Sequence, residues 1–329
     1  MIEVRDLRKW YAGRGRLFSR SAAPLKAVDG VSFSIAAGEV LGLVGESGSG
    51  KSTIGGLLLG LERPTSGEIH FGSLGRVEPH ERRNRLAFTR AAQLVFQNPY
   101  EALNPRHTIA ESILEPLTIH FPDDPAERQR LLIQAMERSG LQPYSRYADR
   151  YPHQLSGGQL QRAAIARAIS IQPTFLVADE PVAMLDVSIR ASVLNLFRYF
   201  ATELGMAILY ISHDLSTMRH LCTNIAVMYR GKFVEMGNAE TVLDEPQHPY
   251  SRSLAASVPI LAPRGTRIRP KLVAPDQVVI RPTEGCAFAP RCPNTLDICR
   301  SQAPALRTLA DGRSASCHRH EAPQPGSER

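Results

Sequence analysis

"VLGLVGESGSGKS", residues 40–52, joins five apolar residues to a glycine-rich turn that ends in lysine and serine. The apolar run predicts a buried strand, and the apolar pattern after Lys51 predicts a helix. The turn between them matches the pattern G-x-x-x-x-G-K-[ST]. Gly45, Gly48 and Gly50 free the backbone so that its N–H groups wrap an anion, which predicts a phosphate-binding loop.

Apolar runs of strand length recur along the chain and extend this unit into a sheet. They lie at residues 93–96, 175–178, 207–212 and 225–229. Helical patterns separate several of them, and this alternation predicts a parallel sheet with helices on both faces. Residues 31–35 alternate and predict an antiparallel flank, while residues 231–237 are expected to form a hairpin with the preceding strand.

The middle of the chain predicts a helical insertion at about residues 98–158. It lacks a strand pattern and contains the amphipathic stretch "ERQRLLIQAMERSG", residues 127–140. The expected fold class is therefore α/β, a P-loop NTPase core of the RecA-like kind with an antiparallel flank and this insertion.

The last quarter of the chain differs in composition. Half of the 24 prolines lie from Pro246 onward, and four of the five cysteines lie between residues 286 and 317. We therefore predict a nucleotide-binding domain at residues 1–245 and a Pro- and Cys-rich extension at residues 246–329.

Charge and hydropathy limit the class of protein. The chain contains no run of eighteen apolar residues that would predict a membrane span. "MIEVRDLRKW" at the N-terminus lacks the apolar segment of a signal peptide, so we expect a cytoplasmic protein.

The net charge is +7, with basic clusters at residues 82–85 and 264–271. These clusters suit solvated surface or an anionic membrane surface. No nucleic acid is expected, because no aromatic residues interleave with them.

Acidic residues follow one of the predicted strands in "FLVADE", residues 175–180. In P-loop proteins the loop lysine reaches the β- and γ-phosphates, and the loop serine and a strand-terminal carboxylate hold Mg²⁺. Here these residues would be Lys51, Ser52 and Asp179. Glu180 beside it is suited to polarise the attacking water.

A second anion cradle occurs in "YPHQLSGGQLQR", residues 151–162. Ser156 suits a helix N-cap, and Gly157 and Gly158 free the backbone before an apolar-patterned helix. Gln97 and His213 each follow a predicted strand, at the edge where ligands bind in α/β proteins.

These motifs, taken in order, resemble the ATP-binding-cassette (ABC) ATPases. The resemblance spans roughly residues 1–245. The matching motifs are "GESGSGKS", "VFQNP", "LSGGQ", "VADE", "AMLD" and "YISHD". The resemblance implies that Tyr11 stacks on adenine, that His213 contacts the γ-phosphate, and that Gln97 joins the Mg²⁺ site and a lid that contacts the transporter. The implied ATP-binding residues are Tyr11, Gly45, Glu46, Ser47, Gly48, Ser49, Gly50, Lys51, Ser52 and Thr53, and the catalytic set is Glu180, His213 and Gln97.

The resemblance also explains why one chain carries two cradles. In this family two cassettes pair head to tail, and each ATP lies between the P-loop of one and the "LSGGQ" of the other. Ser156, Gly157, Gly158 and Gln159 would thus serve the partner's nucleotide, and Asp186 would lie in the loop at the dimer interface. Ala183 stands where the family often has serine, so a hydroxyl contact of that loop is missing.

A narrower similarity is to the oligopeptide/dipeptide importer branch, which includes nickel importers. It rests on "VFQNPYEALNPR" (95–106), "HPYSRSL" (248–254) and "GCAFAPRCP" (285–293). It implies a second ATPase subunit, a paralogue or a second copy, two permease subunits, and indirectly a periplasmic solute-binding protein. The "NPYEALNP" stretch would dock on the permeases at the cytoplasmic side of the inner membrane. Open alternatives are a nickel or other small-solute importer and a non-transport ABC nucleotide switch.

The clustered cysteines indicate a metal site. Cys286, Cys292, Cys299 and Cys317 have the spacing C-x5-C-x6-C-x17-C, and disulfides are disfavoured in a cytoplasmic protein. The first two intervals are longer than the usual structural zinc spacing, and four thiolates suit a [4Fe–4S] cluster. One alternative is a zinc ion with His318 or His320 among its ligands. The other is four thiols that bind no metal.

Overall fold

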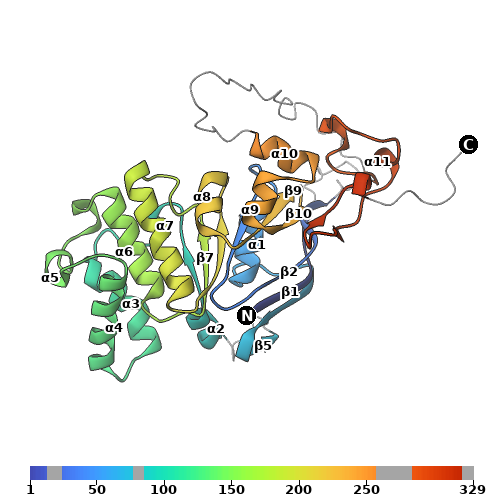
Figure 1. Cartoon of the computed structure of the whole chain (residues 1–329). Coiled ribbons are helices and arrows are strands. Elements are labelled where there is room, and N and C mark those ends of the chain that lie inside the picture. The colour runs from blue at the N-terminus through green and yellow to red at the C-terminus, as the bar shows by residue number, and fades with distance from the viewer. Residues whose placement is uncertain (13–23, 77–84, 257–283, 321–329) are drawn as a thin grey trace, which may run out of the picture.

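The computed structural model of the chain describes residues 1–12, 24–76, 85–256 and 284–320. The described segments form two sheets, a lobe of helices on one side and a small C-terminal extension on the other (Figure 1). The basic cluster at residues 264–271, and Arg82 and Arg83 of the other cluster, lie outside the described residues. No helix within these ranges is long and apolar enough to cross a membrane.

The large sheet has eight strands in the order β11-β12-β10-β9-β3-β8-β7-β6. Strands β9, β3, β8, β7 and β6 pair in parallel, while the remaining pairings are antiparallel. The strands of this sheet are β3 (Val40–Val44), β6 (Ala92–Val95), β7 (Phe175–Asp179), β8 (Ala207–Ile211), β9 (Asn224–Tyr229), β10 (Lys232–Asn238), β11 (Arg307–Thr308) and β12 (Ser314–Ala315).

The parallel strands confirm the strand predictions made from apolar runs. Every residue of β3 and β8 is buried, as expected for strands covered by helices on both faces. The β9–β10 hairpin predicted at residues 231–237 is also present.

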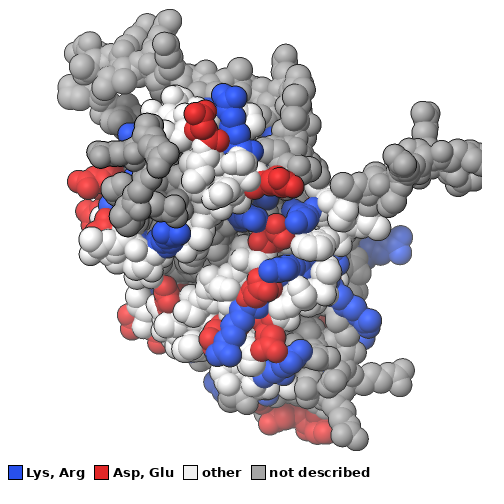
Figure 2. Space-filling model, turned by 90° about the vertical axis from the view of Figure 1, so that its right-hand side faces the viewer, with Lys and Arg blue, Asp and Glu red and all other residues white. Residues whose placement is uncertain are grey.

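The small sheet is antiparallel, with the order β2-β1-β4-β5. It contains β1 (Ile2–Tyr11), β2 (Leu25–Ile35), β4 (Ser66–Phe71) and β5 (Gly75–Arg76). One hydrophobic cluster lies between the two sheets around α1 (Lys51–Leu58), and a second covers the opposite face of the large sheet. Asp29 of β2 links the sheets, because its carboxylate lies 3.6 Å from Lys232 of β10 as well as 3.6 Å from Lys26 of its own strand. Figure 2 shows this side, where acidic and basic side chains are interspersed.

The helices divide into a lobe and a layer around the sheet. The lobe confirms the predicted helical insertion, and it contains α3 (Ile109–His120), α4 (Pro125–Arg138), α5 (Tyr144–Tyr147) and the start of α6 (Gly157–Ile169). Helix α4 begins at an Asp124 N-cap with proline in its first turn, and its apolar face packs on α3 and α6. Outside the lobe, besides α1, lie the helices α2 (Arg85–Ala91), α7 (Val187–Thr202), α8 (Leu215–Leu221), α9 (Ala239–Asp244) and α10 (Pro249–Ala255).

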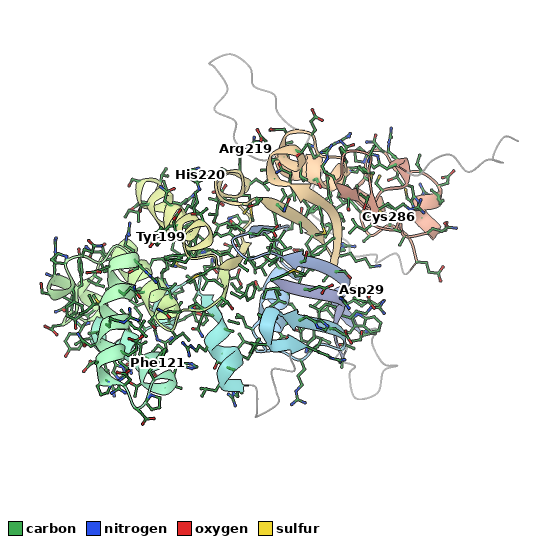
Figure 3. The ribbon with its side chains drawn as sticks, turned by 60° about the horizontal axis from the view of Figure 1, so that its bottom comes forward. Asp29, Phe121, Tyr199, Arg219, His220 and Cys286 are labelled. Atoms are coloured by element: carbon green, nitrogen blue, oxygen red, sulfur yellow. The ribbon has the colours of Figure 1, made fainter. Side chains whose placement is uncertain are left out.

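The C-terminal segment, residues 284–320, lies at the end of the molecule opposite the helical lobe (Figures 1 and 3). It contains α11 (Ile298–Ser301), strands β11 and β12, and the short 3-10 turns η4 (Ala289–Arg291) and η5 (His318–His320). Strand β12 pairs with β10 through Glu235 and Ala315, so this segment extends the sheet of the nucleotide-binding core. Elsewhere in the described part of the chain, 3-10 turns lie at η1 (Gly72–Leu74), η2 (Pro99–Glu101) and η3 (Pro152–Gln154).

Candidate active site

The candidate site lies at the carboxyl edge of four neighbouring parallel strands. In spatial order these are β3, β8, β7 and β6, and they are followed by Gly45, His213, Glu180 and Gln97. Their registers are continuous, for example Leu43 opposite Ile211 and Ile211 opposite Asp179. Because parallel strands end at the same edge, residues far apart in the sequence meet here.

The turn after β3 is held by its own lysine and by close backbone packing. Lys51 Nζ donates hydrogen bonds to the carbonyls of Gly45 and Glu46, at 2.8 and 2.9 Å. Gly50 has φ +110°, and a Cβ there would come within 2.1 Å of the Ala27 carbonyl. A Cβ at Gly45 would come within 2.2 Å of the Met228 carbonyl. Only glycine fits at these two positions, which explains the sequence pattern.

Lys51 is a buried cation surrounded by carboxylates. Burial lowers the pKa of its ammonium group, while the charges of Glu180, Asp179 and Glu46 act in the opposite direction. Burial raises the pKa of Asp179, and a hydrogen bond with Ser52 and the charge of Lys51 oppose this shift. Two oxygen-bearing side chains thus meet beside the lysine, which is a donor set that suits Mg²⁺.

Glu180 makes the central polar contacts of the edge. Its Oε1 lies 2.8 Å from His213 Nδ1, and its Oε2 accepts a hydrogen bond from Gln97 Nε2 at 3.5 Å. Its backbone has φ +47°, a conformation that residues other than glycine seldom adopt. The backbone N–H of Glu180 donates to Ile211 O at 2.9 Å, which holds this turn in place. Strained residues of this kind cluster at functional sites.

Tyr11 lies at the end of β1, beside the helix that follows the loop. Its hydroxyl hydrogen-bonds to the Glu62 carboxylate and interacts with Thr53, and Lys9 Nζ lies 5.0 Å from its ring centre. The structure therefore brings Tyr11 to the P-loop helix.

The "LSGGQ" motif does not belong to the group of residues around the P-loop and the strand edge. Helix α6 packs against α3, α4 and β6, whereas α1 packs against β2, β7 and β8. Ser156 caps α6 through a capping box with Gln159. Gly157 is exposed with open space around it, while a Cβ at Gly158 would come within 2.6 Å of Ile189. The motif thus presents an uncovered helix N-terminus.

Asp186 is exposed and occupies the N-cap position of α7, where its side chain makes no hydrogen bond to the helix. Met184 and Val187 flank it and are 66% and 80% exposed. Exposed apolar side chains on both sides of a polar residue are typical of a surface that another chain covers.

Two residues of the C-terminal part reach the phosphate-binding loop, and the sequence analysis did not place them there. The Tyr250 hydroxyl accepts a hydrogen bond from the Glu46 N–H at 2.8 Å. Both terminal nitrogens of Arg291 bond to the Glu46 carboxylate at 2.9 Å. Arg291 is 245 positions from Glu46, and no pattern within either segment indicates the contact.

The four clustered cysteines line one pocket together with His248, Phe288 and His318. Burial raises the pKa of the Cys286 and Cys317 thiols, and the neighbouring cysteines add to the shift. Among the described residues, no three His, Cys, Asp or Glu side chains form a group that could hold a metal ion. The structure therefore brings the four thiols around one cavity without the arrangement of a single-ion site.

Comparison with known proteins agrees with this geometry. A model of the family "ABC transporter" matches residues 28–183, and one of the "Oligopeptide/dipeptide transporter, C-terminal region" matches residues 234–299. An oligopeptide transport ATP-binding protein of Bacillus subtilis is 41% identical over 97% of both chains. A dipeptide transport ATP-binding protein of Haemophilus influenzae is 42% identical over 96% of both chains.

Solved structures show the same fold. The dimeric ATP-binding cassette MJ0796 bound to ADP and phosphate is 26% identical, with a TM-score of 0.62, and the match covers 73% of this chain and 99% of that one. The chain cbiO1 of Clostridium perfringens, part of an ABC transporter complex, has a TM-score of 0.64 at 26% identity over 74% of this chain and 90% of that one. The chain therefore belongs to the ABC transporter family, as an ATP-binding subunit that hydrolyses ATP.

Proposed function

We propose that this subunit powers the import of di- or oligopeptides. The observation that carries the proposal is that peptide-transport relatives match 96–98% of the chain, and that the C-terminal family model matches residues 234–299. The same match favours a peptide over nickel or another small solute, and over a non-transport nucleotide switch. The proposed organisation is a nucleotide-binding domain at residues 1–245 and an extension from residue 246.

In the proposed mechanism the loop from Gly45 to Thr53 holds the ATP phosphates and Tyr11 stacks on the adenine. Ser52, Asp179 and Gln97 would hold Mg²⁺, which would neutralise charge on the phosphates. Glu180 accepts a proton from the attacking water, since its carboxylate lies at the centre of the strand edge. His213 contacts the γ-phosphate from the adjacent strand end.

The nucleotide site is proposed to be completed by a second ATPase subunit. Ser156, Gly157, Gly158 and Gln159 would face the partner's nucleotide, and the exposed N-terminus of α6 supports this role. Asp186 would lie in the interface, where the exposed Met184 and Val187 would be covered.

ATP-binding subunits of peptide transporters work with permease partners and an ATPase partner. Here we propose two permease subunits, docked at residues 98–105, and an indirect solute-binding protein. In this segment Tyr100 is 59% exposed beside the buried Pro99, which suits a docking contact. The subunit would then lie at the cytoplasmic face of the inner membrane.

The experiment is to purify the tagged chain from membranes in mild detergent and identify the proteins that accompany it. Permease and ATPase subunits should co-purify, and ATP hydrolysis by the reconstituted complex should rise when a peptide-loaded binding protein is added. The Lys51→Ala variant should assemble equally and show no such rise. Stimulation by nickel but not by peptide would reject the peptide assignment, and association with ribosomes or DNA in place of permeases would reject transport.

We also propose that Cys286, Cys292, Cys299 and Cys317 hold a structural [4Fe–4S] cluster. The pocket lined by all four thiols supports it, because a cluster needs its ligands spread around a cavity. Zinc is the alternative, with His318 at the same pocket. Anaerobic purification should give brown protein with about four iron atoms per chain. Stoichiometric zinc would support the alternative, and protein without metal would reject both.

A further inference from the structure

Glu46 is an acidic residue within a loop that binds phosphate. Its charge reaches the phosphate-binding Lys51, since it is one of the three carboxylates that act on the pKa of that ammonium group. A carboxylate here would repel the triphosphate, because like charges at short range are unfavourable. Some other group must offset this charge for the loop to bind ATP well.

Arg291 supplies the offsetting charge. Its guanidinium group forms a two-point pair with the Glu46 carboxylate, with both distances 2.9 Å. The Arg291 side chain is only 11% exposed, and it lies 5.9 and 5.7 Å from the ring centres of Tyr229 and Phe288. These rings hold the guanidinium group in place, so the pair is fixed in one geometry.

Tyr250 fixes the backbone of the same residue. Its hydroxyl accepts the Glu46 N–H, while the Glu46 carbonyl accepts a hydrogen bond from Lys51. The Tyr250 ring is fully buried and lies 4.6 Å from the Tyr229 ring and 5.5 Å from the Phe288 ring, measured between centres. The N–H and the carboxylate of Glu46 are therefore both held from the C-terminal part of the chain.

We propose that Arg291 is a positioning residue for nucleotide binding, which neutralises Glu46 and, with Tyr250, holds it where Lys51 can face the phosphates. The C-terminal segment thus forms part of the wall of the phosphate-binding loop. This inference rests on ATP binding at residues 45–53.

The test compares ATP affinity of the full-length chain and three variants by titration calorimetry. Arg291→Ala leaves the Glu46 carboxylate unpaired beside the phosphates, so the Kd for ATP should rise about fivefold. Adding Glu46→Gln to this variant removes the repulsion and should restore the Kd to within about twofold of wild type. Glu46→Gln alone should bind ATP more tightly than wild type, because Arg291 then adds an uncompensated positive charge.

Two further measurements separate electrostatics from a general loss of structure. The Arg291→Ala defect should shrink as the salt concentration rises, because salt screens charges near the surface. Arg300→Ala, a change at an exposed arginine of the same segment, should bind ATP as wild type does.

Several results would overturn the proposal. They are an unchanged Kd in Arg291→Ala, a failure of Glu46→Gln to rescue it, or a Glu46→Gln protein that binds ATP as weakly as Arg291→Ala. If Arg291→Ala does not fold, the Glu46→Gln result decides alone. Failure of the wild-type chain to bind ATP more tightly than Lys51→Ala would instead reject the nucleotide site itself.

Discussion

The strand edge that carries Glu180 and the C-terminal segment 284–320 are built on different principles. At the edge, the four strands β3, β8, β7 and β6 deliver functional residues by ending at the same place. The segment has short strands and turns, and it is placed by side chains that bind backbone atoms of the core. The edge is therefore set by regular backbone pairing of longer strands, whereas the segment combines one short strand pairing, β12 with β10, with individual polar contacts of its side chains.

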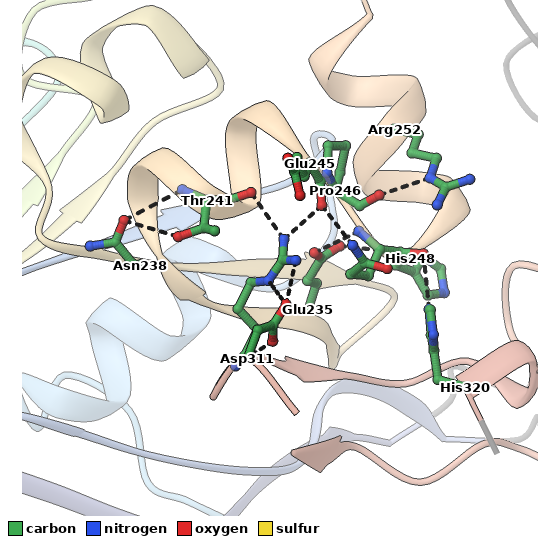
Figure 4. A network of polar contacts seen from close by, with 11 residues as sticks. Glu235, Asn238, Thr241, Glu245, Pro246, His248, Arg252, Asp311 and His320 are labelled. Atoms are coloured by element: carbon green, nitrogen blue, oxygen red, sulfur yellow. Dashed lines mark hydrogen bonds and ion pairs between the residues drawn. The ribbon is translucent and has the colours of Figure 1, made fainter. Parts of the chain in front are cut away.

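One buried charge, Arg313, helps to attach this segment to the core, and another, Glu235, holds the chain that precedes it (Figure 4). Glu235, fully buried in β10, accepts the backbone N–H groups of Gln247 and His248, each at 2.8 Å. Arg313, from the C-terminal segment, donates from Nη1 to the carbonyls of Thr241 and Glu245 at 3.0 and 2.6 Å. Losing one member of such a network leaves its buried partners unsatisfied. Single substitutions should thus affect the two regions differently.

The largest effect is expected at the strand edge. Glu180→Gln removes the proposed base and leaves Lys51 and Ser52, the proposed phosphate and Mg²⁺ ligands, in place. ATP hydrolysis by the assembled complex should fall by at least about a hundredfold, with ATP affinity nearly unchanged. The matched control is Glu203→Gln, an exposed position at the end of α7, which should hydrolyse ATP normally. Near-normal turnover in Glu180→Gln would remove Glu180 from the mechanism.

A second large effect is expected where α6 presents its N-terminus. Ser156→Arg should leave the chain's own ATP affinity within about twofold, because Ser156 is proposed to serve the partner's nucleotide site. ATP-dependent pairing with the second subunit should be lost, and cross-linking measures this pairing. Ser145→Arg, exposed elsewhere in the helical lobe, is the control and should pair normally. An ATP affinity as low as that of Lys51→Ala would contradict a site shared between two chains.

The same contrast explains how much the sequence predicts. The P-loop strand, the acidic pair after β7 and the helical insertion follow from apolar runs and their alternation, so they were predictable. Strands β1 and β4 were not predicted, because β1 carries five charged residues and pairs through an irregular register.

The attachment of the C-terminal segment was also beyond sequence reasoning. The sequence analysis places no strand in this Pro- and Cys-rich segment, yet β12 adds to the large sheet and Arg291 reaches the P-loop. Such contacts join single side chains over long sequence separations, and no local period marks them. The proposed roles of the site residues remain predictions that the experiments above address.

An intermediate effect is expected at His248, which caps α10 by accepting the Tyr250 N–H at Nδ1. Burial lowers the pKa of His248 to about 4, and the nearby His320 adds to the shift. Between pH 6.5 and 4 the unfolded state therefore binds a proton that the folded state does not, so stability falls as the pH falls through this range. Acidification from pH 7 to pH 5 should cost about 2 kcal/mol from this group.

His248→Asn tests this expectation, because the asparagine oxygen keeps the cap and does not titrate. Hydrogen exchange in α10 and residues 284–320 should accelerate on acidification in wild type, after correction for intrinsic rates, and much less in the variant. Equal acceleration in both proteins would show that other groups control the acid sensitivity. His153→Asn, at an exposed position in the helical lobe, should behave as wild type does.

The smallest effect is expected from Tyr250→Phe, which removes the hydroxyl that α10 places against the backbone of Glu46, beside the Arg291 pair. The ring can remain packed against Tyr229 and Phe288, so the fold should persist. The Glu46 N–H loses its acceptor, but Glu46 is exposed and water can replace the hydroxyl. The Kd for ATP should therefore rise only about twofold.

Salt dependence distinguishes this contact from the Arg291 pair. The Tyr250→Phe defect involves a neutral hydrogen bond and should stay constant as salt rises, whereas the Arg291→Ala defect should shrink. Tyr199→Phe, a partly exposed tyrosine of α7, is the control and should bind ATP as wild type does. A Tyr250→Phe defect that exceeds that of Arg291→Ala would mean that the loop is held chiefly by the packing of α10 and not by the charge of Arg291. The two regions would then be joined by packing alone.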